Sequence, residues 1–192
     1  METNENKLYP IFLKPKELEI LIIGGGWVAE EKLTFLLKSS PDAKVTMVAP
    51  IYRKGTLDVA GKGKVDLVFD EYHSDFLRGK HLVIACTDLP SVNKQVFRDC
   101  RERNTLVNVA DNPPYCDFYM GGIVTKGNVK VAISTNGKSP TTAKRLRQFF
   151  EEVLPENIDD LVENLNTYRK SIGGSFEKKV STLNELTKSL VE

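Results

Sequence analysis

The sequence lacks an excess of charge of either sign, and it lacks any long apolar run. Its 192 residues include 27 Lys and Arg against 26 Asp and Glu, a formal net charge of +1. A protein defined by nucleic-acid binding carries a large basic excess, and a membrane-spanning helix needs ~20 consecutive apolar residues. Residues 1–7 also lack the apolar stretch of a signal peptide. We therefore expect a cytoplasmic protein with neither nucleic acid nor a membrane as its partner.

Cysteine and histidine are scarce as well. The three cysteines, Cys86, Cys100 and Cys116, have no paired short spacing, which disfavours a disulfide framework or a zinc site and suits reduced thiols in a cytosolic protein. The two histidines, His73 and His81, stand alone in the sequence, so we predict no metal site. The chain is nevertheless 41% hydrophobic and can bury a core of one domain with an appendage.

Short β-branched runs alternate with helical patterns over the first 110 residues. The predicted strands cover residues 18–23, 44–48, 65–69, 81–86 and 106–109. The predicted helices cover residues 27–38 and 90–103. Strand and helix in alternation imply parallel strands with crossover helices, and therefore a Rossmann-like, doubly wound α/β sheet.

The pattern changes after residue 112, where two consecutive prolines interrupt any regular element. Strand-like runs over 118–124 and 129–135 predict a hairpin. Ser139 followed by Pro140 predicts the start of a helix, and Pro155 ends that helix. Two amphipathic segments, 158–172 and 176–191, follow. We therefore divide the chain into a Rossmann domain over 1–112, a hairpin and helix region over 113–150, and a helical region over 151–192.

A glycine motif follows the first predicted strand and opens the first predicted helix. Residues 24–29 have the form Gly-x-Gly-x-x-Ala, which in this context is typical of dinucleotide binding. Gly24 permits a tight turn, Gly26 lets the backbone approach a pyrophosphate, and the helix N-terminus offers free N–H groups to the phosphates. The alternative is a glycine turn without a ligand.

One feature of an NAD site is missing. An acidic residue ~20 positions further on usually holds the adenosine ribose of NAD. Here the second strand ends at Pro50 and Ile51 without a carboxylate, and Arg53 just beyond could meet a 2′-phosphate. The residues alone leave the choice between NAD and NADP open.

Charge is strongly polarised along the second half of the chain. Residues 118–150 contain no acid and six bases, namely Lys126, Lys130, Lys138, Lys144, Arg145 and Arg147. Residues 151–164 contain no base and six acids, namely Glu151, Glu152, Glu156, Asp159, Asp160 and Glu163. A basic cluster beside a dinucleotide site predicts a small anionic substrate, and the acidic block could meet the basic block of a second subunit. Solvated surface is the alternative interpretation.

Two carboxylates follow predicted strands at the sheet edge where ligands of such folds bind. Asp111 comes just after the fifth strand, and Asp88 follows the fourth. Asp111 could take a proton during oxidation of a substrate, whereas loop statistics alone favour an Asp that caps a turn.

The chain resembles the precorrin-2 dehydrogenase / sirohydrochlorin ferrochelatase family of siroheme biosynthesis, which includes the N-terminal module of siroheme synthase. The resemblance lies in residues 9–13, 22–32, 85–88, 92–93, 107–111 and 131–140. The last of these blocks, from Val131 to Pro140, is more discriminating than the glycine motif. No methyltransferase module follows, so we expect the stand-alone form.

The resemblance implies NAD-dependent oxidation of precorrin-2 to sirohydrochlorin, followed in some members by insertion of ferrous iron. It also implies a homodimer built largely from the region after the Rossmann domain. Asp111 matches the aspartate regarded as catalytic in the family. The positions that line the NAD site of relatives are Trp27, Val28, Pro50, Ile51, Thr87 and Asp88.

The substrate class agrees with the charge pattern, because precorrin-2 is a tetrapyrrole fringed with carboxylates. We expect Asn136, Lys138 and Ser139, in the stretch without acids, to bind it. The alternative function is a non-catalytic sensor or carrier module that binds NAD or a tetrapyrrole, and formation of product by the purified protein separates the two.

Overall fold

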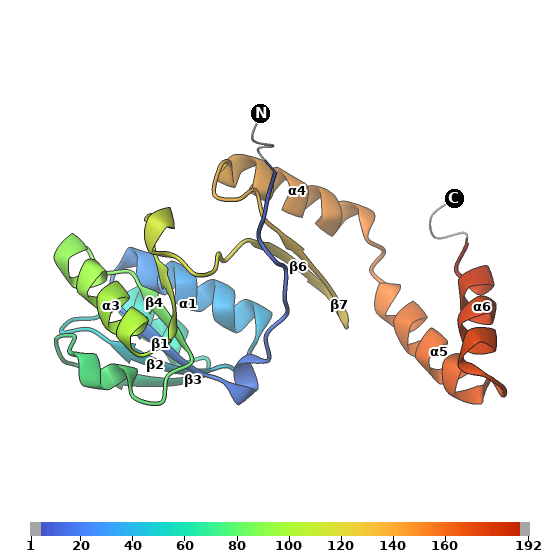
Figure 1. Ribbon diagram of the computed structural model, residues 1–192, viewed down its shortest axis with the longest axis horizontal. Helices are drawn as coiled ribbons and strands as arrows, with labels where there is room; N and C mark the ends of the chain where they lie inside the picture. Colours follow the sequence, from blue (N-terminus) through green and yellow to red (C-terminus); the bar gives the residue numbers. More distant parts are fainter. Residues whose placement is uncertain (1–4, 189–192) are drawn as a thin grey trace. The chain divides into compact units, whose positions relative to one another are not determined.

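The computed structural model describes residues 5–188, which fall into two compact units (Figure 1). The first unit holds residues 5–120 together with 136–138, and the second holds residues 121–135 together with 139–188. The end of the predicted segment 176–191 and the terminal residues of the outer predicted domains lie outside the described residues. Among residues 5–188, no helix is long and apolar enough to cross a membrane.

The first unit is built on a sheet of five parallel strands in the order β3-β2-β1-β4-β5. The strands are β1 (Glu19–Ile23), β2 (Lys44–Val48), β3 (Lys64–Val68), β4 (Leu82–Ala85) and β5 (Leu106–Val109). Ile23 is in register with Val48 on one side and Ala85 on the other, so the strands end at one common edge. The prediction of a Rossmann-like sheet is confirmed.

Helices cover both faces of this sheet (Figure 1). Ala29 and Leu33 of α1 (Trp27–Ser39) pack with Ile20 and Ile22 on one face. On the other face, α3 (Pro90–Glu102) packs with the alternate residues of β1. Because successive strand side chains point to opposite faces, β1 is buried on both sides and reads as an unbroken apolar run.

One helix of this unit is absent from the sequence-based prediction. The seven-residue α2 (Lys54–Ala60) carries Gly55 and Thr56 in its first turn, and glycine and β-branched residues are poor helix formers. Three short 3₁₀ turns, η1 (Pro15–Glu17), η2 (Ser74–Leu77) and η3 (Pro113–Tyr115), were not predicted either. Propensity cannot reveal elements that tertiary packing stabilises.

The second unit opens with an antiparallel hairpin of β6 (Gly122–Lys126) and β7 (Val129–Ile133). Gly127 in its turn has φ +55°, a conformation that favours glycine. The first strand starts four residues later than predicted. Phe118 belongs to the first unit instead, where its carbonyl accepts a hydrogen bond from Asn108 Nδ2 at 2.7 Å.

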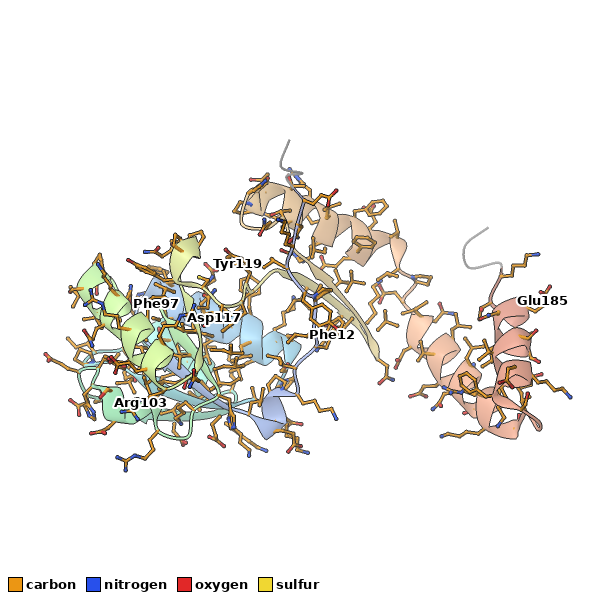
Figure 2. All side chains as sticks on the ribbon, viewed as in Figure 1. Phe12, Phe97, Arg103, Asp117, Tyr119 and Glu185 are labelled. Carbon is orange, nitrogen blue, oxygen red and sulfur yellow. The ribbon has the colours of Figure 1, made fainter. Side chains whose placement is uncertain are left out.

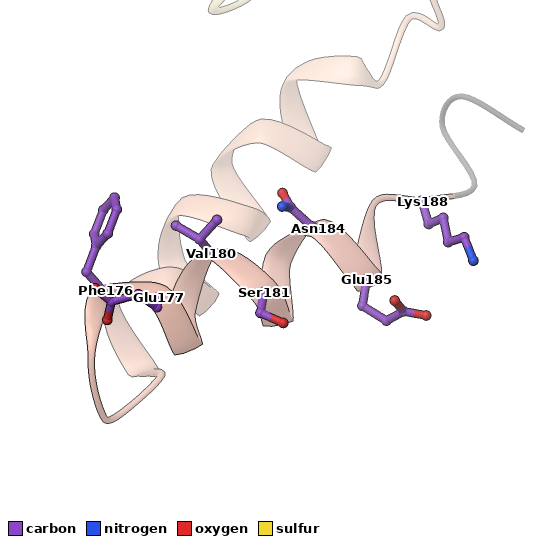
Figure 3. Close-up of a pocket in the computed structure, with 7 residues that line it drawn as sticks. All are labelled: Phe176, Glu177, Val180, Ser181, Asn184, Glu185 and Lys188. Atoms are coloured by element: carbon purple, nitrogen blue, oxygen red, sulfur yellow. The ribbon is translucent and has the colours of Figure 1, made fainter.

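Three helices complete the second unit: α4 (Pro140–Val153), α5 (Ile158–Ser171) and α6 (Phe176–Leu186). The predicted cap of α4 is confirmed, because the Ser139 hydroxyl accepts a hydrogen bond from the Thr142 N–H at 3.2 Å. A hollow of about 600 Å³ runs along α6 (Figure 3). It is lined by Phe176, Glu177, Val180, Ser181, Asn184, Glu185 and Lys188, none of which is a predicted site residue.

The acidic and basic blocks meet within a single chain. Lys126 Nζ lies 2.6 Å from Glu156 Oε1, and Arg147 pairs with Glu151. Asp159 accepts a hydrogen bond from the backbone N–H of Asn128 at 2.6 Å. Glu156 and Asp159 thus connect the segment around the start of α5 to the hairpin of the same chain, whereas the Glu151 pair lies within α4.

Candidate dinucleotide site

The carboxyl edge of the parallel sheet gathers most of the predicted site residues. Beyond the strands, the backbone continues the ladder: Gly24 N donates to Val48 O, Cys86 N to Ile23 O, and Ala110 N to Ala85 O, each at 2.9 Å. The glycine turn, the segment after β4 and the segment after β5 therefore leave the sheet side by side. Ligands of open α/β sheets bind at this edge.

Each glycine of the turn meets a different surrounding. Gly24 has φ +131°, and a Cβ there would lie 2.8 Å from the carbonyl oxygen of Cys86. A Cβ on Gly25 would lie 2.2 Å from the carbonyl oxygen of Ile51. A Cβ on Gly26 would meet nothing within 4 Å. The first two glycines are therefore required by the protein's own packing, whereas the third leaves open space above the backbone.

That open space lies at the N-terminus of α1. Gly26 is the N-cap residue and no side chain caps the helix there, so its first N–H groups have no partner within the helix. Such an end attracts anions through its N–H groups and its partial positive charge. The turn fits the diphosphate of a dinucleotide, because the backbone can be approached where no side chain projects.

The start of α2 holds the glycine turn in place, a role that sequence reasoning missed. Thr56 Oγ1 donates to the carbonyl of Gly25 at 2.9 Å, and Arg53 N donates to the same oxygen at 3.0 Å. Thr56 is fully buried. No spacing rule identifies such a threonine; only its burial in the fold does.

The other residues expected to line the cofactor site differ in exposure. Trp27 and Ile51 are exposed by 72% and 79%, unusual values for large apolar side chains. Pro50 is exposed as well, and Val28 is half-buried. Exposed apolar side chains at a ligand-binding edge suit contact with flat rings.

The Thr87–Asp88 loop after β4 is clamped by Asn93 of α3. Asn93 Oδ1 accepts from the Thr87 N–H at 3.1 Å and from its hydroxyl at 2.8 Å, while Asn93 Nδ2 donates to the Thr87 carbonyl at 2.9 Å. Asp88 at the tip is exposed. Asn93 therefore positions this loop. It could have been found from the sequence, because it lies in one of the blocks that resemble the family.

Asp111 leaves the same edge in an exposed turn with φ +57°, a left-handed conformation that Asp and Asn tolerate better than most residues. Asn112 N closes the turn on the Val109 carbonyl at 3.2 Å. Beyond it, Asp117 (labelled in Figure 2) returns along β5 and accepts from Val107 N at 3.0 Å. Arg101 pairs with Asp117 at 2.7 Å, so the chain is fixed on both sides of Asp111.

The three residues expected to bind substrate lie on the connection between β7 and α4. Asn136 has φ +54°. Asn136 and Lys138 are grouped with the first unit, whereas Ser139 belongs to the second. The Ser139 hydroxyl is engaged in the cap of α4. Asn136 and Lys138 therefore share a compact unit with Asp111.

The cysteines do not provide a nucleophile. Burial raises the pKa of the Cys86 and Cys100 thiols to about 12, and burial also raises that of Cys116. Such thiols stay protonated and unreactive near neutral pH. Within residues 5–188 no group of three or more His, Cys, Asp or Glu side chains could hold a metal ion.

Residues 11–122 match a protein family described as "Putative NAD(P)-binding". This chain belongs to that family. A second family, "Sirohaem biosynthesis protein central", matches residues 126–152. The residues that match the NAD(P)-binding family include the whole parallel sheet and its carboxyl edge. This match agrees with the open glycine turn.

Curated relatives carry names from siroheme biosynthesis. Over 168 residues, 88% of its length, the chain is 36% identical to the siroheme synthase of Pseudoalteromonas translucida (strain TAC 125). Over 163 residues, 85% of its length, it is 34% identical to siroheme synthase 1 of Aeromonas hydrophila subsp. hydrophila. It covers 35% of each of these relatives, so the chain spans about a third of their length.

A solved structure, "SirC, precorrin-2 dehydrogenase", has a similar fold. The TM-score is 0.73 at 23% sequence identity, covering 93% of this chain and 89% of that one. At this identity the similarity establishes the fold, including the hairpin and the helices that follow the parallel sheet.

Proposed function

We propose that this chain catalyses the NAD-dependent oxidation of precorrin-2 to sirohydrochlorin in siroheme biosynthesis. The observation that carries the proposal is the open turn at Gly26, which shares one sheet edge with the exposed carboxylate of Asp111. Membership of the NAD(P)-binding family and the names of the curated relatives support it.

We assign the diphosphate of NAD to the turn at Gly24 and Gly26 and to the N-terminus of α1. We assign the remaining cofactor contacts to Trp27, Val28, Pro50, Ile51, Thr87 and Asp88. When bound, NAD supplies a nicotinamide ring that accepts a hydride. Asp111 would take up the proton that the substrate loses together with that hydride, with a carboxylate oxygen as the acceptor.

We propose that Asn136, Lys138 and Ser139 bind the carboxylates of the tetrapyrrole. The stretch 118–150 supports this role, because it holds six bases and no acid and a basic surface attracts a polyanion. We further propose that residues 1–112 hold the NAD site, that residues 113–150 provide dimerisation and substrate binding, and that residues 151–192 form a helical extension. Insertion of ferrous iron into the product would be a second activity of the same protein.

Replacing Asp111 tests the catalytic role. Asp111→Asn keeps a residue that tolerates the left-handed backbone but removes the base, so turnover of precorrin-2 should fall at least about 100-fold while the affinity for NAD is retained. The assay follows the change in absorbance with purified protein, and ferrous ion added afterwards reports chelation. Asp75→Asn, an equal charge change in η2, is the control. A near-normal rate for Asp111→Asn would refute the role, and absence of product with the unaltered protein would favour a sensor or carrier.

We also propose that the protein works as a homodimer in the cytoplasm, where its three free cysteines would remain reduced. Sedimentation equilibrium should give twice the chain mass of 21.5 kDa. A single species at the chain mass, at micromolar concentration and physiological salt, would refute the dimer.

A further inference from the structure

A charged pair stands beside the glycine turn. Arg53 Nη1 lies 2.7 Å from Glu30 Oε2, and the Arg53 guanidinium carbon lies 3.0 Å from the centre of the Trp27 ring. Trp27 is the first residue of α1, and Glu30 lies one turn further along it. Arg53 thus contacts both Glu30 and Trp27 beside the glycine turn.

The position of Arg53 is fixed by its backbone. Its N–H donates to the carbonyl of Gly25 at 3.0 Å, in the segment that follows β2. In this fold the residue after the second strand faces the 2′ position of the adenosine ribose, where an acid favours NAD and an arginine accommodates the 2′-phosphate of NADP. Pro50 and Ile51 provide no acid, so Arg53 alone would favour NADP.

Glu30 changes that balance because it is packed against Arg53 rather than loosely paired with it. A Cβ on Gly55 of α2 would lie 2.4 Å from Glu30 Oε2, so the carboxylate sits closely against the backbone of α2. The side chains of Arg53 and Glu30 are exposed by only 34% and 26%. A partly buried pair is screened less by solvent than a fully exposed one.

A hollow of about 300 Å³ adjoins this pair. It is lined by Trp27, Val28, Glu30, Glu31, Thr34 and Phe35. The hollow combines apolar rings with the carboxylates of Glu30 and Glu31, so it offers flat surfaces beside negative charge. An additional phosphate placed here would meet that charge.

We propose that Glu30 selects NAD over NADP. It neutralises Arg53, holds the guanidinium on Trp27, and places a carboxylate next to the ribose 2′ position, where it repels a phosphate and accepts a hydrogen bond from a hydroxyl. The inference rests on the dinucleotide site of the proposed function. It assigns to α1 the acid that the end of β2 lacks.

The test compares the binding of NAD and NADP to four proteins: the unaltered chain, Glu30→Gln, Arg53→Gln and the double variant. Trp27 is the only tryptophan, so quenching of its emission reports binding directly, and isothermal calorimetry gives an independent dissociation constant. Glu30→Gln should shift the preference about tenfold toward NADP, chiefly by tightening NADP binding. The shift should shrink at high salt. It should also be smaller when Glu30→Gln is made in the Arg53→Gln background, because the part that comes from the released guanidinium is then lost and only the direct effect of the carboxylate remains.

The matched control is Glu31→Gln, which removes an equal charge from a residue that lines the same hollow but whose carboxylate lies 3.2 Å from Lys32 Nζ. Equal NADP gains for Glu30→Gln and Glu31→Gln would overturn the specific role of Glu30, as would an unchanged preference in Glu30→Gln. If Glu30→Gln fails to fold, the Arg53→Gln variant tests the inference instead. Arg53→Gln should leave the affinity for NAD nearly unchanged and should weaken the residual binding of NADP. Binding of neither dinucleotide to the unaltered chain would instead refute the proposed function, a result distinct from these.

Discussion

At the scale of single residues, the glycines of the turn have different roles, some in folding and one in binding. Gly24 and Gly25 are confined by carbonyl oxygens of Cys86 and Ile51, whereas Gly26 faces open space. Backbone carbonyls cannot move aside as flexible side chains can. Loss of the first two glycines should therefore affect stability, and loss of the third should affect the ligand.

Two alanine substitutions separate these roles. Gly25→Ala should lower the free energy of unfolding by about 2 kcal/mol, because its Cβ would overlap a fixed backbone oxygen. Gly26→Ala should leave that free energy nearly unchanged, since Gly26 has φ −87°, but it should weaken NAD binding about tenfold or more by filling the space above the helix end. Guanidinium unfolding and calorimetric titration measure the two quantities. Equal losses of stability in both variants would contradict this division.

The residues of the candidate site were predictable to different degrees. The place of Asp111 followed from the end of a strand, because parallel strands bring their carboxyl ends to one edge. Its left-handed backbone did not follow, since a single φ depends on the turn closed by Asn112. Gly25 was not singled out, because its neighbour Ile51 is distant in sequence and comes close only through the fold.

At the scale of elements, β-branched runs located every strand of the parallel sheet to within about two residues. Burial on both faces makes such runs distinctive. Helix α2 was missed because its seven residues have little intrinsic preference for helix, and it forms where Thr56 and Arg53 meet the glycine turn. The element that supports the site is therefore the one with the weakest local signal.

In the hairpin, by contrast, the first strand was predicted too long. The apolar run from residue 118 extended the predicted first strand backwards, but Asn108 draws Phe118 onto β5. A long-range hydrogen bond to a buried amide thus outweighed local strand propensity. In the acidic block, Glu156 and Asp159 contact Lys126 and Asn128 of the same chain, contacts that the charge pattern alone did not reveal.

At the scale of the whole molecule, a buried tyrosine hydroxyl and a buried cysteine thiol with raised pKa values make the stability depend on pH. Burial raises the pKa of Tyr52 to about 12, although its hydroxyl donates to the Val68 carbonyl at 2.8 Å. Cys86 is 5% exposed, and burial likewise raises the pKa of its thiol. Both side chains lie against the glycine turn, with Cys86 next to Gly24 and Tyr52 next to Gly25.

The sign of the effect follows from proton binding. Below pH 9 the Cys86 thiol is protonated in the folded and the unfolded chain and adds no pH dependence. Between pH 9 and about 12 the unfolded chain loses this proton while the folded chain keeps it, so the free energy of unfolding falls with rising pH. One such group contributes a slope of about −1.4 kcal/mol per pH unit.

Cys86→Ala should therefore flatten the alkaline part of the stability curve. Guanidinium unfolding at pH 8 and pH 10.5 should show a fall in the unfolding free energy that is about 1 to 2 kcal/mol smaller in the variant than in the unaltered chain. Between pH 6 and 8 the two curves should run parallel, which separates the proton linkage from the constant cost of the missing sulfur. Parallel curves through the alkaline range as well would mean that the Cys86 thiol ionises as readily in the folded chain as in the unfolded one.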